Sequence, residues 1–210
     1  MERIEARPDV QEPVVALTFD DGPSPWTEMI LDRLAEHGGH ATFFSLGCTV
    51  ADRPETMKRI VDSGSEVGNH TFTHHYLTLL DDESIIQEVT RATAVIEDVA
   101  GVSPTLWRAP YLDSDQRVNA AVATLGLDEV WYSVMPGDWQ LPAEETARRT
   151  ISALRPGAIV CLHDGRPPNE PSGASDPTRE GTAEAVGTIL DAMEARGLRS
   201  VTVSELLAAR

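Results

Sequence analysis

The sequence predicts an α/β fold in which parallel strands are joined by helical crossovers. Seven short runs rich in apolar residues alternate with longer segments of helical periodicity. This alternation is typical of parallel sheets, because each strand needs a crossover connection before the next can begin at the same edge. The main polar clusters follow the predicted strands, and parallel α/β folds build their sites at the carboxyl ends of strands. A barrel and an open doubly wound sheet both fit this pattern.

The individual elements follow from apolar patterning and from the residues that flank each run. The predicted strands are residues 14–19, 40–46, 66–70, 105–108, 129–134, 158–163 and 199–202. The predicted helices are residues 26–37, 54–63, 82–100, 114–125, 143–154 and 182–196. Glycines such as Gly64 and Gly101 stand at the predicted helix ends, where a left-handed residue is often needed. Residues 165–181 are rich in proline and glycine, which predicts a long loop.

Length, charge and cysteine content narrow the class of protein. A chain of 210 residues fits a single domain over residues 1–210. It has 17 basic and 34 acidic residues, a formal net charge of −17, so phosphate backbones and anionic lipids are not expected partners. No apolar stretch approaches the roughly 20 residues of a membrane span, and no leader is visible. We therefore expect a cytoplasmic protein without membrane insertion, unless an export signal was removed beforehand. Cys48 and Cys161 are predicted to be buried free thiols.

Two motifs suggest a metal site. Residues 18–23 read Thr-Phe-Asp-Asp-Gly-Pro, which places the adjacent carboxylates of Asp20 and Asp21 at a strand end. Alone, this segment equally fits an ordinary polar turn. His70 and His74, however, are four residues apart, and on a helical turn they would share one face and bind one ion. His75 would point elsewhere and, like His37 and His40, is predicted to be structural or exposed.

Three further clusters are weaker signals when taken singly. Arg108, Ala109, Pro110 and Tyr111 follow a predicted strand, which also fits a surface turn. Asp138 and Trp139 equally fit a turn with a partly buried aromatic ring, and His163 could simply end an apolar strand.

In chain order, these motifs resemble those of the NodB-homology polysaccharide deacetylases, also called carbohydrate esterase family four. The resemblance extends from about Val14 to Thr202. It implies a deformed (β/α)7 barrel of the NodB-homology type. It also implies a hydrolase that removes acetyl groups from an N-acetylated sugar or oligosaccharide.

The resemblance also assigns roles to individual residues. Asp21, His70 and His74 would bind one divalent metal ion, with zinc expected and cobalt or another transition metal as the alternative. Asp20 would be the base, with Arg108 behind it. His163 would be the acid, with Asp138 keeping it protonated. The substrate-binding residues would be Tyr111, through its backbone N–H, and Trp139 and Leu162, which would surround the acetyl methyl group; for these last two, plain core packing is an equal alternative.

Three positions depart from the family pattern. Met135 replaces an aspartate before the Asp138-Trp139 pair, Cys161 replaces a leucine before His163, and Leu112 replaces the glycine after the tyrosine. These changes affect the predicted acyl pocket, and the 165–181 loop would lie beside it. Together with the expected cytoplasmic location, the three departures favour a small, soluble substrate such as a biosynthetic intermediate. An O-acetyl esterase of the xylan type also stays open.

Two other functional classes compete with a deacetylase. Two histidines and one carboxylate also bind iron(II) in oxygenases. Those enzymes typically use β-sheet folds, whereas this sequence alternates strand and helix. The second rival is a non-catalytic sugar-binding relative, because a protein can keep its fold after it has lost catalytic activity. The presence of both Asp20 and His163 disfavours that reading.

Overall fold

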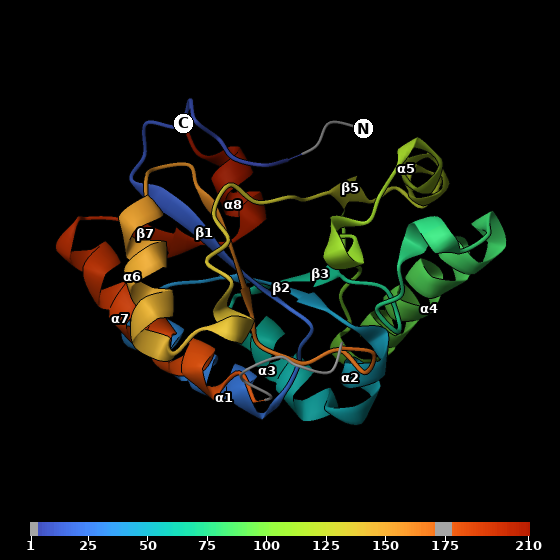
Figure 1. Cartoon of the computed structure of the whole chain (residues 1–210), viewed down its shortest axis with the longest axis horizontal. Helices are drawn as coiled ribbons and strands as arrows, with labels where there is room; N and C mark the ends of the chain where they lie inside the picture. The colour runs from blue at the N-terminus through green and yellow to red at the C-terminus, as the bar shows by residue number, and fades with distance from the viewer. Residues whose placement is uncertain (1–3, 171–177) are drawn as a thin grey trace.

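Seven parallel strands form the sheet at the centre of the computed structural model, which describes residues 4–170 and 178–210 (Figure 1). The predicted α/β fold is therefore confirmed. The strands are β1 (Val14–Asp20), β2 (Thr42–Ser45), β3 (Glu66–Asn69), β4 (Leu106–Trp107), β5 (Asp128–Glu129), β6 (Ile159–His163) and β7 (Arg199–Val201).

Strand β1 occupies the middle of the sheet. The strand order is β5-β4-β3-β2-β1-β6, and β7 also pairs with β1. Asp20, the last residue of β1, is aligned with Phe44 of β2 on one side and with His163 of β6 on the other. The register therefore brings the predicted base and the predicted acid to the same end of the sheet.

The predicted strand 129–134 is regular only at its start. Val130 N–H still donates to Trp107 O of β4 at 2.8 Å, but Val134 N–H donates to Ile159 O of β6 at 3.1 Å. The segment changes its hydrogen-bonding partner from β4 to β6 within a few residues, so it does not form a continuous strand with either one. These bonds connect the two edges of the sheet, as the predicted deformed barrel requires.

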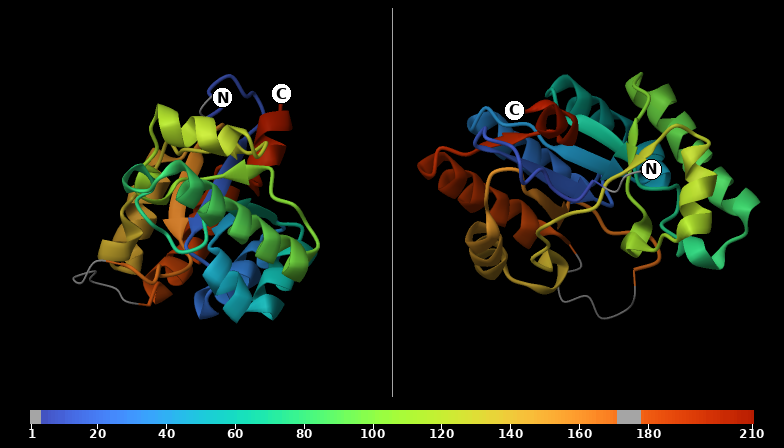
Figure 2. Two further views of the ribbon diagram at one scale, coloured as in Figure 1. Left: turned by 90° about the vertical axis from the view of Figure 1, so that its right-hand side faces the viewer. Right: turned by 90° about the horizontal axis from the view of Figure 1, so that it is seen from above.

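Helices surround the sheet, and successive views show them on its outer side (Figures 1 and 2). Helices α6, α7, α1, α3, α4 and α5 pack each on the next in that spatial order. Their bounds, with those of the two short helices α2 and α8, are α1 (Pro25–Glu36), α2 (Gly47–Asp52), α3 (Pro54–Asp62), α4 (Asp82–Ala100), α5 (Gln116–Ala123), α6 (Ala143–Ala153), α7 (Glu180–Ala195) and α8 (Val203–Ala208). Sequence periodicity missed α2 and α8 because six residues are too few to show it. No helix in the described ranges is long and apolar enough to cross a membrane.

Alternation along the strands sorts side chains between two cores. On β1, Leu17 and Phe19 join the large core cluster that packs against the helices, whereas Ala16 joins a second cluster with residues of β4 and β6. Successive strand residues point to opposite faces. Thr18 and Asp20 therefore share the face of Ala16, which is the interior of the barrel.

Candidate active site

A cavity of about 560 Å³ lies at the carboxyl ends of the strands. Its lining comes from residues far apart in the sequence: Asp20, Asp21, His70, His74, Tyr76, Arg108, Ala109, Tyr111, Leu112, Tyr132, Met135, Trp139, Gln140, Cys161, His163, Pro167, Glu170 and Arg179. Apart from Asp138 and Leu162, all the residues predicted for the site line this cavity.

Asp20 is held in place by a buried arginine. Arg108 Nη1 donates to Asp20 Oδ1 at 2.6 Å and to Thr18 Oγ1 at 2.8 Å. The other guanidinium nitrogens donate to the carbonyls of Val130 and Trp131, each at 3.1 Å. Charge-assisted hydrogen bonds of this kind are short and strong. Asp20 is thereby fixed with Oδ1 on Arg108, while its Oδ2 accepts from the Cys161 thiol at 3.4 Å.

Asp21, His70 and His74 converge beside Asp20. His70 Nε2 lies 3.4 Å and His74 Nε2 lies 3.2 Å from Asp21 Oδ1. Tetrahedral zinc with bonds of about 2.0–2.2 Å would separate its N and O donors by about 3.4 Å. Within the described residues, the buried Asp21 Oδ1 has no hydrogen-bond donor. The donor types, spacing and orphaned oxygen all fit a divalent metal ion.

The protonation of the three groups also suits an ion. His70 Nδ1 must donate to the carbonyl of Arg108, 2.8 Å away, which leaves the lone pair of Nε2 directed at Asp21. Burial lowers the pKa of His74 to about 4, although the negative charge of Asp21 acts to raise it. The imidazole of His74 is therefore neutral at neutral pH. Burial would raise the pKa of Asp21, but the facing imidazoles hold it well below its ordinary value. The site therefore offers the Nε2 of His70, a neutral imidazole at His74 and the carboxylate of Asp21.

The two histidines do not share a helical turn, which corrects the sequence prediction. Residues 70–74 form a loop in which Thr71 and His74 have φ values of 69° and 63°. Asn69 Oδ1 accepts from the Thr71 N–H at 2.8 Å, and Glu88 Oε2 accepts from the Thr73 N–H at 2.8 Å. These side-chain acceptors replace helical backbone bonds. They turn the loop so that both rings face Asp21.

His163 is bound through one ring nitrogen. Asp138 Oδ1 lies 3.0 Å from His163 Nδ1, and Asp138 Oδ2 accepts from the His163 N–H at 2.9 Å and from Thr182 Oγ1 at 2.8 Å. Burial would lower the pKa of His163. The Asp138 carboxylate outweighs it, with help from Asp21 and Asp20, and raises the pKa to about 9. The ring is therefore cationic at neutral pH.

Of the three residues predicted to bind substrate, two line the cavity and one does not. Tyr111 and Trp139 line the cavity, and the ring of Trp139 lies edge-on to that of His163 with centroids 4.8 Å apart. Leu162 must be corrected: it is fully buried in the core cluster beneath the helices. Strand alternation directs Leu162 away from the cavity and directs its neighbours Cys161 and His163 into it. All three departures from the family pattern line the cavity.

Sequence reasoning missed several residues at the cavity mouth. Tyr76 is 44% exposed and Tyr111 is 39% exposed, and their rings stack with centroids 4.0 Å apart. In the 165–181 loop, Asn169 Nδ2 donates to the His74 carbonyl at 2.6 Å, and Glu170 pairs with Arg179. Pro167, Glu170 and Arg179 line the cavity, as the predicted position of the loop requires, whereas residues 180 and 181 already belong to α7. Residues 171–177 lie outside the described residues. No periodic or motif signal in the sequence marks these contacts.

Known proteins with similar sequences are deacetylases. The chain is 42% identical over 187 residues to the chitooligosaccharide deacetylase of Bradyrhizobium sp. (strain ANU 289), a match over 87% of this chain and 85% of that protein. It is 34% identical over 200 residues to the peptidoglycan-N-acetylmuramic acid deacetylase PdaC of Bacillus subtilis, over 94% of this chain and 39% of that protein. The PdaC structure superimposes with a TM-score of 0.84 at 32% identity, over 94% of this chain and 91% of that one.

A pseudoenzyme shares the same architecture. A carbohydrate esterase family 4 pseudoenzyme from Bacillus anthracis superimposes with a TM-score of 0.85 at 25% identity, over 98% of this chain and 69% of that one. A similar fold therefore does not by itself show that a protein is catalytically active. That question depends on the side chains at the site. Residues 7–130 match the sequence profile described as Polysaccharide deacetylase. From this match and the relatives above, the chain belongs to the polysaccharide deacetylase family.

Proposed function

We propose that this protein is a metal-dependent hydrolase that removes acetyl groups from the amide nitrogens of N-acetylated sugar oligomers. The observation that carries the proposal is the meeting of three groups in one cavity: a carboxylate with two imidazoles, the carboxyl group of Asp20, and the imidazole of His163, whose pKa is raised to about 9. Amide hydrolysis needs all three, because water must be activated, a proton accepted, and a poor amine leaving group protonated.

Asp21, His70 and His74 would hold the metal ion. An ion bound there lowers the pKa of coordinated water and polarises the acetyl carbonyl, and zinc suits this donor set best. The protein's contribution is orientation. The Arg108 carbonyl fixes the His70 tautomer, and the loop bonds of Asn69 and Glu88 fix the direction of His74.

Asp20 is the proposed general base. Its Oδ1 is occupied by Arg108, so the cavity-facing Oδ2 is the atom that accepts a proton from the attacking water. The Arg108 guanidinium holds the carboxylate in this orientation. The backbone N–H of Tyr111 is the proposed donor to the developing oxyanion, as the family resemblance implies.

His163 is the proposed general acid. Asp138 binds Nδ1, so Nε2 is the nitrogen that donates a proton to the departing amine. Because Asp138 raises the pKa of His163 to about 9, the ring carries this proton at neutral pH. Trp139 lies against the same ring, which favours a contact between Trp139 and the acetyl group.

The cavity mouth favours an oligosaccharide over a single sugar. The relatives named above include a chitooligosaccharide deacetylase and a peptidoglycan deacetylase. In this chain, the stacked rings of Tyr76 and Tyr111 form an exposed apolar platform at the edge of the cavity. Aromatic faces of this kind bury apolar area at low conformational cost. A sugar next to the reacting unit would lie on this platform.

The first experiment addresses the reaction itself. Asp20→Asn keeps the shape of the side chain but removes its ability to accept a proton, so acetate release from N-acetylated oligosaccharides should fall about 10²- to 10⁴-fold. The metal content of the purified variant should match that of the unmodified protein. Undiminished acetate release would refute the role of Asp20, and loss of metal would make Asp20 a ligand.

The second experiment tests the ligand set with a matched pair of histidines. His70→Ala should lose the bound ion and activity, because it removes one of three protein ligands. His75→Ala should retain both, since His75 is exposed and does not line the cavity. Metal content by elemental analysis after dialysis is the measurement. Equal metal loss in the two variants would contradict the assignment.

The third experiment uses pH. His163 must be protonated to act, and its pKa is raised to about 9, so activity should fall as the pH rises through that value. Asp138→Asn removes the carboxylate that raises this pKa. The alkaline limb of the kcat profile should therefore move to lower pH and the maximum rate should fall, with metal content unchanged. An alkaline limb that stays in place in both Asp138→Asn and His163→Ala would assign it to another group.

The fourth experiment tests the aromatic platform. Tyr76→Ala should raise KM for an N-acetylated oligosaccharide about 3- to 10-fold, because contacts with an aromatic ring contribute about 0.5–1.5 kcal/mol beyond burial. Tyr76→Phe keeps the ring and should behave like the unmodified protein. KM for a short substrate that ends at the reacting sugar should not change. A KM that rises equally for long and short substrates would contradict this platform.

A further inference from the structure

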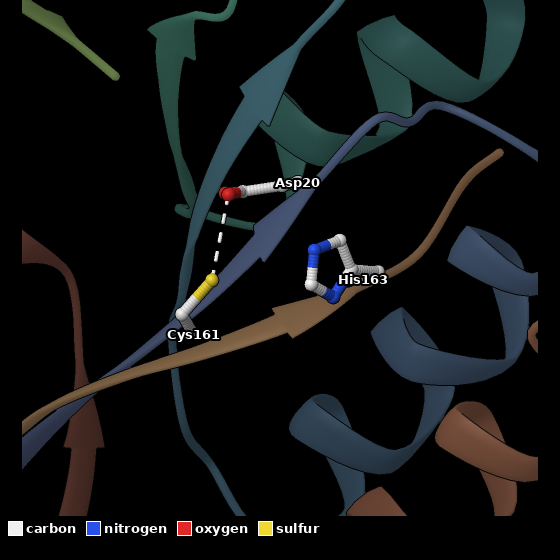
Figure 3. A group of neighbouring side chains, drawn as sticks. All are labelled: Asp20, Cys161 and His163. Carbon is white, nitrogen blue, oxygen red and sulfur yellow. Dashed lines mark hydrogen bonds between the residues drawn. The ribbon is translucent and has the colours of Figure 1, made fainter. Parts of the chain in front are cut away.

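A second group of metal-type donors lies beside the first. Figure 3 shows Asp20 at the end of β1 with Cys161 and His163 on the neighbouring strand β6. One donor atom from each residue, a carboxylate oxygen, a sulfur and a ring nitrogen, lies within 4.8 Å of the others. Cys161 and His163 are two residues apart on a strand, so both face the barrel interior together with Asp20.

The spacing of the sulfur and the carboxylate oxygen suits a tetrahedral ion. The Cys161 thiol donates a hydrogen bond to Asp20 Oδ2, with Sγ and Oδ2 3.4 Å apart. Zinc with a Zn–S bond of about 2.3 Å and a Zn–O bond of about 2.0 Å at tetrahedral angles separates the two donors by about 3.5 Å. Asp20 Oδ1 is held by Arg108, so Oδ2 is the carboxylate oxygen that would bind an ion. The ion would take the place of the thiol proton between Sγ and Oδ2.

The third donor, His163, is also oriented for metal binding. His163 Nδ1 is bound by Asp138, which leaves Nε2 as the nitrogen for an ion. A carboxylate behind a ligating histidine is the usual arrangement of zinc sites, since it orients the ring and increases its basicity. The thiol completes the set. Burial and the charge of Asp20 raise the pKa of Cys161, so the sulfur keeps its proton until a cation replaces it.

We propose that Asp20, Cys161 and His163 bind a second divalent ion, of the soft or borderline type such as zinc or cadmium, and that this ion inhibits the enzyme. Binding displaces the thiol proton of Cys161 and the ring proton of His163 into solvent, and the ion forms bonds to Sγ, Nε2 and Asp20 Oδ2. The occupied Oδ2 no longer accepts a proton and the occupied Nε2 no longer donates one. The inhibition rests on the proposed roles of Asp20 and His163, whereas the binding does not.

Cys161 distinguishes this second site from the first. Asp21, His70 and His74 offer only oxygen and nitrogen, whereas sulfur is the ligand that selects soft ions. A spectroscopic signal of sulfur ligation therefore reports the second site alone. The chain also supplies a matched control, because Cys48, the other free cysteine, lies in α2 and does not line the cavity.

The binding test titrates the full-length holoenzyme with cobalt(II) and cadmium(II) beyond one equivalent. The unmodified protein and Cys48→Ala should develop a sulfur-to-metal charge-transfer band as a second equivalent binds. Cys161→Ala should show no such band, and its affinity for the second ion should be weaker by about tenfold or more. Absence of the band in the unmodified protein, or its persistence in Cys161→Ala, would overturn the site.

The inhibition test measures acetate release in excess zinc relative to release at one equivalent, for each variant separately. This ratio should fall sharply for the unmodified protein and for Cys48→Ala, and Cys161→Ala should need about tenfold or more zinc for the same fall. A charge-transfer band without inhibition would overturn the inhibitory role and would count against Asp20 and His163 as base and acid. No acetate release at one equivalent, with the band present, would refute the proposed function but not the second site.

Discussion

One buried arginine connects the two halves of the site. The guanidinium of Arg108 binds the carboxylate of Asp20, and the backbone carbonyl of the same residue accepts from His70 Nδ1. The first contact fixes the proposed base through one of its two oxygens. The second contact sets the tautomer of a proposed metal ligand. The second contact depends on the end of β4 lying next to β3, and the first on the Arg108 side chain reaching across the barrel interior to the end of β1.

Burying this charge is costly unless every donor is occupied. The described structure offsets much of this cost with four hydrogen bonds, to Asp20, Thr18 and the carbonyls of Val130 and Trp131. These two carbonyls belong to the segment that leaves β4 for β6, where the regular ladder ends. The irregularity that shortens β5 thus supplies acceptors to Arg108. The deformation of the barrel thus helps to hold the arginine that fixes Asp20.

Strand alternation has a comparable effect on the other side of the cavity. In β6 it directs Val160 and Leu162 toward the helices and Cys161 and His163 toward the site. A residue at position 161 therefore always faces the proposed base, whatever its chemistry. With leucine it would be an apolar wall, but with cysteine it adds a soft ligand 3.4 Å from Asp20 Oδ2. One substitution on this face thus adds a chemical property to a site whose backbone is unchanged.

Local pattern determined much of this protein. Apolar runs alternating with helical segments predicted parallel strands, and Gly101, predicted to stand at a helix end, ends α4 in the left-handed region. The motifs around Asp20, His70, Arg108 and His163 predicted which side chains meet, because the ends of parallel strands lie at one edge. These inferences need only nearest neighbours in sequence and a parallel sheet.

Tertiary structure decided the rest. The 70–74 loop is shaped by Glu88 of α4, an acceptor distant in sequence, so its non-helical course had no local signal. Leu162 does not line the predicted acyl pocket, because which face of β6 points into the barrel depends on the layers that cover the strand. Tyr76 reached Tyr111, and Asn169 reached His74, only through contacts between separate loops. Such contacts depend on how the chain folds back on itself, which residue spacing along the sequence does not encode.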